Sequence, residues 1–287
     1  MSEQLSFGAR LAAVMASRGQ LCVGIDPHPG TLAIWGLEDS VTGLKEFSLR
    51  MLEAAADRAA AIKPQVALYE RHGSAGIAVL EGLLADAASA GVLTIADAKR
   101  GDIGSTMAAY ADAWLSPDSA LAADAVTLSP YLGFESLRPA LDLAQAQARG
   151  VFVLALTSNP EGASVQHVGA DEDEGAVARR ITEAAAAENA VERARTLAQL
   201  GSTGLVIGAT VGAAVERLGL DLRGMGGPIL APGLGAQGAS GADLRSVFGA
   251  AYPQVLATSS RGIADAGPDH EALAGAVEAT LADLTSD

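Results

Sequence analysis

Two charged residues two positions apart, Asp97 and Lys99, are the strongest chemical signal in the sequence. The apolar and β-branched run at 93–96 directly before them predicts a buried strand. If the pleat continues, residues 97 and 99 project to one face, while Ala98 and Arg100 project to the other. A carboxylate and an ammonium are then held side by side, either as a simple surface ion pair or as part of an active site.

The residues that follow add more polar groups to the same strand end. Gly101 is expected to break the strand, and Asp102 is expected to be the N-terminal cap of a helix. Thr106 lies one helical turn after Asp102 and therefore shares its face. Three charged groups and a hydroxyl are thus predicted to crowd one strand end.

Other polar residues follow apolar runs in the same way, always on the C-terminal side of a predicted strand. They are Asp26, Lys63, Ser158, Pro232 with Gly233, and Arg261. In a barrel of parallel strands these ends meet at one mouth, so two carboxylates and two ammoniums would form a network of alternating charge. Stability alone explains such a network poorly, because buried ionic groups often contribute little net stability.

A glycine-rich turn at 231–238 and Arg261 predict a phosphate site. They follow the last two predicted strands, and the loops after strands seven and eight are the usual phosphate site of (β/α)8 barrels. Backbone N–H groups, a helix N-terminus and an arginine can together hold a dianion there. The sequence therefore predicts a small phosphorylated ligand.

Short apolar runs alternate with helical patterns along the whole chain, which predicts a parallel sheet. The eight expected strands are residues 21–25, 59–62, 93–96, 125–129, 151–156, 204–209, 228–231 and 255–259. This rhythm favours an α/β fold, a single (β/α)8 TIM barrel over residues 1–287, with an extra N-terminal helix at 4–17 as a cap. An open doubly wound sheet is the alternative, but strand one is not followed by G-x-G-x-x-G. Residues 161–174 are expected to form a long loop.

Composition limits the partners and the compartment. Nineteen basic against thirty-four acidic residues give a net charge of −15, which argues against nucleic-acid binding. The single cysteine, Cys22, can form no internal disulfide and builds no metal cluster, so a reducing cytoplasm fits best. With no long apolar run and no signal-like N-terminus, we expect a soluble chain without a membrane partner.

Several of these stretches together resemble the orotidine 5′-phosphate decarboxylase family, in particular its longer bacterial subgroup. The matching stretches are residues 97–103 with Thr106, 21–26, 62–65, 231–237 and the segment around Arg261. The resemblance spans nearly the whole chain and implies a lyase that converts orotidine 5′-phosphate to uridine 5′-phosphate (UMP) and CO2 in pyrimidine biosynthesis. It implies neither a cofactor nor a metal, because the family relies on a fixed ammonium rather than an electron sink.

The resemblance also implies a role for each matching residue. Lys99 would protonate C6 of the pyrimidine, Asp97 would face the substrate carboxylate, and Lys63 would complete the charge chain. Asp102 and Thr106 would reach into the neighbouring active site of a homodimer. The remaining implied contacts are Asp26 and Lys63 to ribose, Ser158 to the pyrimidine, Gln237 between base and phosphate, Arg261 to phosphate, and Pro232 in the substrate-binding turn.

Two other functions remain open at this point. Metal-dependent sugar-phosphate decarboxylases and epimerases of the same barrel group share Asp-x-Lys-x-x-Asp, but the resemblance implies an acidic ligand where this chain has Lys63. A non-catalytic barrel that senses UMP is the other alternative, and the presence of both Asp97 and Lys99 argues against it.

Overall fold

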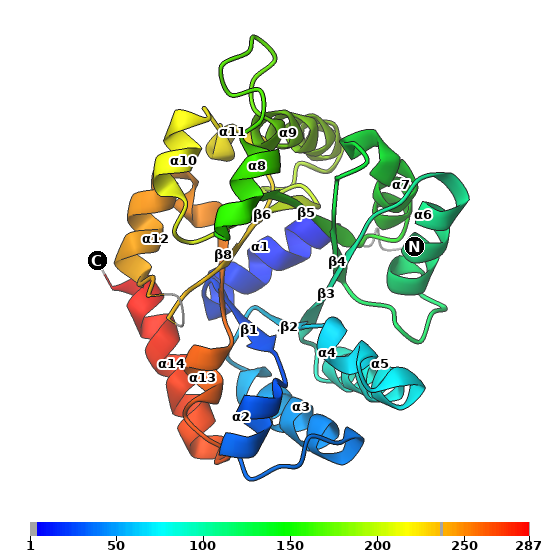
Figure 1. Ribbon diagram of the computed structural model, residues 1–287, viewed down its shortest axis with the longest axis vertical. Coiled ribbons are helices and arrows are strands. Elements are labelled where there is room, and N and C mark those ends of the chain that lie inside the picture. Colours follow the sequence, from blue (N-terminus) through cyan, green and yellow to red (C-terminus); the bar gives the residue numbers. More distant parts are fainter. Residues whose placement is uncertain (1–4, 236–237, 287) are drawn as a thin grey trace.

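Eight parallel strands close into a barrel in sequence order, as the sequence predicts. The computed structural model describes residues 5–235 and 238–286 (Figure 1). The strands are β1 Leu21–Ile25, β2 Ala61–Pro64, β3 Leu93–Arg100, β4 Ala125–Leu128, β5 Gly150–Leu156, β6 Thr203–Ile207, β7 Ile229–Pro232 and β8 Val255–Ser259. Three of them, β2, β3 and β7, end later than predicted. Lys63, the Asp97–Lys99 pair and Pro232 therefore lie inside these strands rather than after them.

Helices surround the barrel and connect successive strands (Figure 1). The longer ones are α1 Phe7–Arg18, α3 Val41–Ala55, α5 Gly73–Ser89, α6 Gly104–Leu115, α7 Arg138–Ala146, α9 Val177–Thr196, α12 Gly241–Phe248 and α14 His270–Thr285. The shorter ones are α2 Pro29–Ile34, α4 Ala67–Glu70, α8 Ala163–Gln166, α10 Gly212–Arg217, α11 Leu222–Met225 and α13 Arg261–Ala264, with 3-10 turns at Phe134–Leu137, Pro160–Gly162 and Gly249–Gln254. Among the described helices none is both long and apolar enough to cross a membrane.

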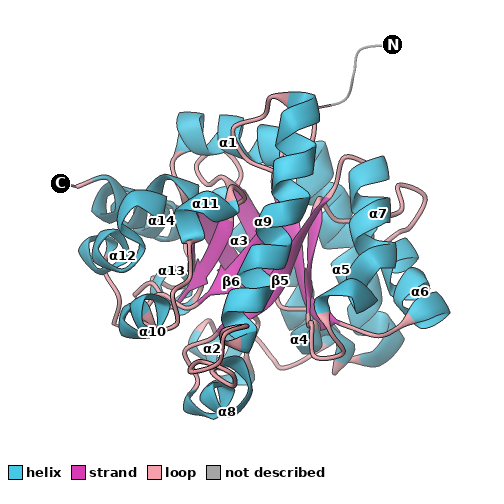
Figure 2. Ribbon diagram, turned by 90° about the horizontal axis from the view of Figure 1, so that it is seen from above, coloured by secondary structure: helices cyan, strands magenta, loops and turns pink. Residues whose placement is uncertain are grey.

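Helix α1 closes the N-terminal end of the barrel, as expected for the extra helix. In side view it lies at one end of the strands, whereas α2, α4 and α8 lie at the other (Figure 2). Its buried face, Phe7, Leu11 and Met15, recurs every three to four residues and packs into the barrel interior. Phe7 meets Phe152 of β5 edge to face, with ring centroids 6.0 Å apart. Because α1 fills this end, the opposite mouth is left for function.

The period-two alternation of the strands divides the core into two layers. Residues such as Cys22, Ile95 and Leu230 face the barrel interior, and their neighbours Val23 and Ala96 pack under the outer helices. Burial raises the pKa of the Cys22 thiol to about 12, so this cysteine stays protonated and unreactive. The same alternation continues toward the mouth, where the inward positions become polar.

Two expectations about loops need correction. Asp102 does not cap α6: the capping position is Ile103, and the Asp102 carboxylate instead accepts a hydrogen bond from the adjacent Ile103 N–H at 2.8 Å. Gly104, with a φ of 54°, starts the helix later than a cap at 102 allows. The segment 161–174 is partly helical rather than a loop throughout, because Gln166 of α8 hydrogen-bonds both the N–H and the hydroxyl of Thr157.

Candidate active site

The C-terminal ends of the strands surround a cavity of about 340 Å³. This volume lies in the range of small-molecule sites, roughly 300–1,000 Å³. Seven residues predicted from the sequence line it: Asp26, Lys63, Asp97, Lys99, Pro232, Gly233 and Arg261. Apolar side chains of Leu154, Val206 and Leu230 are part of the same lining. The cavity therefore combines convergent charges with an apolar wall.

Asp97 links two lysines across its two carboxylate oxygens. Lys63 Nζ on β2 donates to Oδ2 at 2.8 Å, and Lys99 Nζ donates to Oδ1 at 2.5 Å. Two neutral groups complete the set, because Gln65 Nε2 donates to Oδ2 at 3.2 Å and Thr127 Oγ1 donates to Oδ1 at 2.9 Å. Four donors thus hold one carboxylate in a fixed orientation.

The two lysines differ in their access to the cavity. The Lys63 side chain is 6% exposed, whereas that of Lys99 is 44% exposed. Lys63 therefore lies deep in the cavity lining, while Lys99 presents its ammonium nearer the mouth. The three charged side chains therefore run from a buried lysine, Lys63, through Asp97 to an exposed lysine, Lys99.

The charge states of the buried members reinforce one another. Burial alone would raise the pKa of Asp97, but the ammoniums of Lys63 and Lys99 and their hydrogen bonds outweigh it and hold this pKa well below the usual range. Burial would lower the pKa of Lys63, yet the charges of Asp97 and Asp26 raise it above its ordinary value. Across neutral pH, Asp97 stays an anion and Lys63 a cation.

The carboxylate of Asp26 is a further polar group in the cavity, separate from the Lys63–Asp97–Lys99 set. Asp26 follows β1, and its Oδ1 is buried and has no hydrogen-bond partner among the described residues. Buried carboxylate oxygens normally have a partner, so an open one in a cavity marks a place for a ligand donor such as a hydroxyl. Asp26 therefore fits the ribose contact expected of it.

The predicted phosphate elements meet at the other side of the cavity. Gly233 after β7 and Ser260 and Arg261 after β8 line it together. Gly233 and Gly235 adopt φ values of 123° and 73°, which favour glycine and let the turn present its backbone. The guanidinium of Arg261 stays exposed at this edge, as an anion site requires. Gln237, predicted between base and phosphate, lies outside the described residues.

Three predicted residues do not line the cavity within this chain. Thr157 and Asn159 line it where Ser158 was expected, and Ser158 itself lies close against Gly208. Asp102 and Thr106 lie outside the cavity, and the Thr106 side chain is exposed. Asp102 and Thr106 are therefore not part of the cavity of their own chain, whereas Ser158 lies between two residues that line it.

Sequence reasoning missed several polar residues of the site. Gln65 directly follows β2 and lies two positions after Lys63, so period-two alternation points both side chains inward, and this signal could have found it. Thr127 on β4 is fully buried, and nothing in its own segment singles it out. Three further residues that line the cavity were also not predicted: Thr157, Asn159 and Thr258.

The donor set suits a charge network rather than a metal. Each oxygen of Asp97 already accepts two hydrogen bonds, which leaves it a poor ligand. Within residues 5–235 and 238–286, no three His, Cys, Asp or Glu side chains gather closely enough to hold a metal ion.

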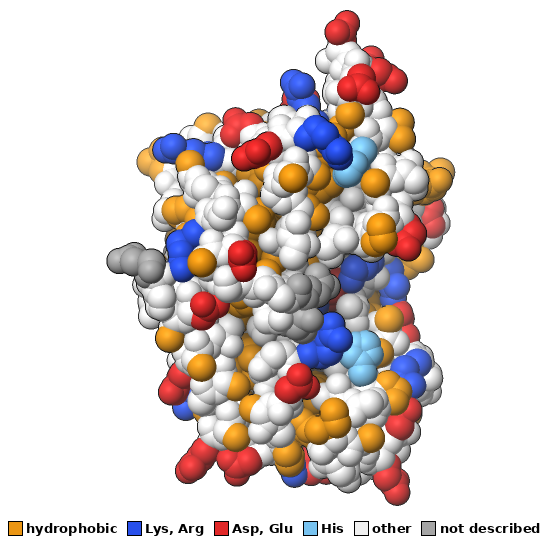
Figure 3. Space-filling view, turned by 60° about the vertical axis from the view of Figure 1, so that its left-hand side comes forward, with side chains coloured by type: hydrophobic (Ala, Val, Ile, Leu, Met, Phe, Trp, Pro, Cys, Tyr) orange, Lys and Arg blue, Asp and Glu red, His pale blue; other side chains and the backbone are white. Residues whose placement is uncertain are grey.

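The surface matches a local anion site on an acidic protein. Acidic side chains are scattered over the face seen in Figure 3, in keeping with the net charge of −15. Several basic side chains lie beside the recess near the middle of that face (Figure 3). A negative ligand would meet local positive charge there despite the overall charge.

Comparisons with known proteins agree on one family. Residues 19–276 match the sequence model described as Orotidine 5′-phosphate decarboxylase / HUMPS family. The orotidine 5′-phosphate decarboxylase of Salinispora tropica is 55% identical over 278 residues, covering 97% of this chain and 96% of that protein. That of Streptomyces coelicolor is 54% identical over 272 residues, covering 95% and 94%. The structure of Leishmania donovani OMP decarboxylase aligns with a TM-score of 0.75 at 30% identity, covering 98% of this chain and 100% of that one.

Proposed function

Because the chain belongs to the orotidine 5′-phosphate decarboxylase family, it is a decarboxylase of UMP biosynthesis, and we propose that it works through the Lys63–Asp97–Lys99 charge chain. The main support for this proposal is the difference in exposure within the charge chain: the Lys63 side chain is buried and the Lys99 side chain is exposed. Residues 1–287 act as a single catalytic domain in this proposal. The unpaired, buried Cys22 suits a reducing compartment, so we place the enzyme in the cytoplasm.

Lys99 is the proposed proton donor. The bond between C6 of the pyrimidine and its carboxylate carbon breaks, CO2 leaves, and the electron pair stays on C6. A proton moves from Lys99 Nζ to C6 to give UMP, and the lysine is protonated again from water. Only an ammonium that faces the cavity can do this, and Lys99 is the exposed one of the pair.

Asp97 and Lys63 set the electrostatics of that step. The Asp97 carboxylate is fixed by four donors and would lie beside the substrate carboxylate, whose departure relieves the repulsion between them. The Lys99 ammonium is held where negative charge develops on C6, so little reorganisation is needed in the transition state. Lys63 keeps the buried Asp97 charged, and no cofactor enters this scheme.

Substrate binding falls to residues on the other strands. Asp26 and Lys63 are proposed to bind the ribose, Ser158 the edge of the pyrimidine, and Arg261 the phosphate. Pro232, at the end of β7, is proposed to contact the substrate, and Gln237 is proposed to bind between base and phosphate. Phosphate binding remote from C6 supplies free energy that orients the reacting groups.

Arg261→Ala is expected to weaken substrate binding while leaving the chemical step largely intact. Loss of a charge-assisted contact to the phosphate should raise KM for orotidine 5′-phosphate about 10- to 100-fold. Turnover of orotidine, which has no phosphate, should change less than about threefold, because Arg261 has nothing to bind on it. Arg179→Ala, at an exposed position of α9, is the control. Equal losses on both substrates would contradict a phosphate contact.

We also propose a homodimer in which Asp102 and Thr106 complete the partner's active site. Neither lines the cavity of its own chain. Exposed apolar residues, here called the apolar cluster, lie on the segments that follow the paired ends of β3 and β4. They are Ile103, Tyr131 and Leu132, which are 61%, 79% and 54% exposed. Apolar side chains gathered at a surface are typical of an interface, and α6 begins directly behind them.

Ile103→Asp is expected to convert the dimer to a monomer and to lower activity at least about tenfold. A charge placed in the apolar cluster must be desolvated on association. Light scattering gives the mass, and the kinetics are measured on the same sample. Leu197→Asp is the matched control, since Leu197 is 90% exposed and lies at the C-terminus of α9. A fully active monomeric Ile103→Asp variant would contradict the shared site.

A substrate panel tests the function itself. Chelator-treated enzyme is mixed separately with orotidine 5′-phosphate and with sugar-phosphate acids, and each reaction is repeated with added Mg²⁺. We expect loss of orotidine 5′-phosphate absorbance without metal and no reaction of the sugar phosphates. Turnover of a sugar phosphate that depends on Mg²⁺ would instead indicate the metal-dependent members of this barrel group.

A further inference from the structure

A single hydroxyl on β4 joins the two catalytic groups of β3. Thr127 Oγ1 donates a hydrogen bond to Asp97 Oδ1 at 2.9 Å and accepts one from the backbone N–H of Lys99 at 2.9 Å. Thr127 is fully buried and is not among the residues that line the cavity. It can therefore act on the reaction only through Asp97 and Lys99.

The backbone at this point explains why a side chain is needed there. The register between β3 and β4 shifts: Ala96 pairs with Val126, and Arg100 already pairs with Leu128. Three residues of β3 therefore oppose Thr127 alone, which is a bulge. A bulge interrupts the regular ladder of backbone bonds, and in its place the Thr127 hydroxyl accepts the hydrogen bond of the Lys99 N–H.

Lys99 also has an unusual backbone conformation. Its φ is 48°, in the left-handed region that a lysine rarely adopts and that persists only where surrounding contacts hold it. The hydrogen bond to Thr127 is such a contact. The direction in which the Lys99 side chain leaves the strand, and hence the place of its ammonium, follows from this conformation.

We infer that Thr127 is a positioning residue for the decarboxylation: its hydroxyl fixes the Lys99 backbone and the Asp97 carboxylate relative to each other. This inference rests on the proposed function of that pair. Because Thr127 does not line the cavity, we expect its loss to affect the chemical step more than substrate binding. A displacement of about 1 Å between reacting groups can cost on the order of 100-fold in rate.

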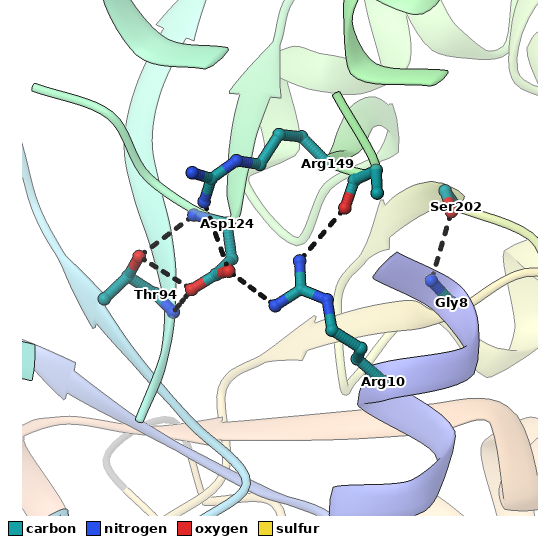
Figure 4. Close-up of polar contacts among 7 residues, drawn as sticks. Gly8, Arg10, Thr94, Asp124, Arg149 and Ser202 are labelled. Carbon is teal, nitrogen blue, oxygen red and sulfur yellow. Dashed lines mark hydrogen bonds and ion pairs between the residues drawn. The ribbon is translucent and has the colours of Figure 1, made fainter. Parts of the chain in front are cut away.

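The opposite end of the barrel supplies a matched control. Thr94 on β3 is also buried, and its hydroxyl also bonds one carboxylate and one backbone N–H, both of Asp124, at 3.3 and 3.0 Å. Figure 4 shows this group at the end closed by α1, where Arg10 and Arg149 also contact Asp124. Removing either hydroxyl deletes the same kinds of hydrogen bond, but only Thr127 is connected to the active site.

The test compares Thr127→Val, Thr127→Ser and Thr94→Val with the wild-type enzyme. For each variant, Tm, UMP affinity, KM and kcat per UMP-binding site are measured with orotidine 5′-phosphate. Thr127→Val is expected to lower kcat about 10- to 100-fold with KM and UMP affinity within about threefold, and Thr127→Ser to stay within about threefold of wild type. Thr94→Val should lower Tm and leave kcat per site unchanged. If Thr127→Val cannot be purified, Thr127→Ala takes its place.

Three results would overturn the inference. They are a wild-type kcat in Thr127→Val, a serine variant as slow as the valine variant, and an equal fall of kcat in Thr94→Val. An inactive wild-type enzyme would refute the proposed function instead, so the two failures are distinguishable.

Discussion

Lys99→Ala is expected to lower kcat on orotidine 5′-phosphate by about 10³- to 10⁴-fold. The variant loses the more exposed ammonium of the pair, and with it both the proposed proton donor and the positive charge proposed to lie nearest C6. Lys63 cannot replace it, because its side chain is 6% exposed and lies on the other oxygen of Asp97. Affinity for UMP should fall less than about tenfold, since the phosphate and ribose contacts remain.

The chain offers a simple control for this variant. Its only lysines are Lys45, Lys63 and Lys99, and Lys45 is exposed on α3, outside the cavity. Lys45→Ala should keep wild-type kcat and KM. Stopped-flow turnover and UMP titration on the same samples separate chemistry from binding. A Lys99→Ala enzyme within tenfold of wild-type kcat would show that another group protonates C6.

Asp97→Asn is expected to have the second largest effect, on both turnover and stability. It leaves the buried Lys63 ammonium without its hydrogen-bonded carboxylate, and breaking a buried pair by removing one member typically costs about 3–5 kcal/mol of unfolding free energy. We expect kcat per folded enzyme to fall at least about 10³-fold, because the Lys99 ammonium also loses the carboxylate that orients it.

The lowered pKa of Asp97 also predicts how its contribution to stability changes with pH. The pKa of Asp97 is lower in the folded protein than its unfolded value of about 3.9. Its stabilising contribution is therefore full above about pH 4 and is lost as pH falls toward the folded pKa. Urea melts between pH 5 and pH 8 should show a constant difference between wild type and Asp97→Asn.

Asp124→Asn is the matched control for Asp97→Asn. Asp124 is also a largely buried carboxylate with two cationic partners, Arg10 and Arg149, at the closed end of the barrel (Figure 4). This variant should lose stability and keep kcat per folded enzyme. If Asp97→Asn also lost stability but kept kcat per folded enzyme, the role of Asp97 would be structural only.

Features that depend on local period were predictable from the sequence. Alternation along the strand predicted that Asp97 and Lys99 lie together, which they do, although the bulge and the positive φ of Lys99 also set that placement. The repeated strand and helix pattern was enough to predict the closed barrel. Arg261 and the turn after β7 were predicted to meet because both follow strand ends that converge.

Features that depend on the register between neighbouring strands, or on contacts between distant residues, were not predictable. Thr127 reaches Asp97 only because β3 bulges against β4, and no pattern within either segment fixes that register. The expected cap at Asp102 was wrong because Gly104 opens α6 with a positive φ that a spacing rule does not anticipate. The helical turn at α8 depends on the Thr157–Gln166 contact across nine residues. Each depends on a tertiary contact rather than on local propensity.

Stoichiometric turnover of the wild-type enzyme is the direct test of whether this barrel decarboxylates orotidine 5′-phosphate without a metal. Chelator-treated protein is mixed with orotidine 5′-phosphate labelled at its carboxylate, and labelled CO2 and UMP are counted together. We predict one CO2 and one UMP for each substrate consumed, over many turnovers and without added metal. Tight binding of UMP without any release of CO2 would contradict decarboxylase activity. Release of CO2 only after Mg²⁺ is added would contradict a metal-independent reaction.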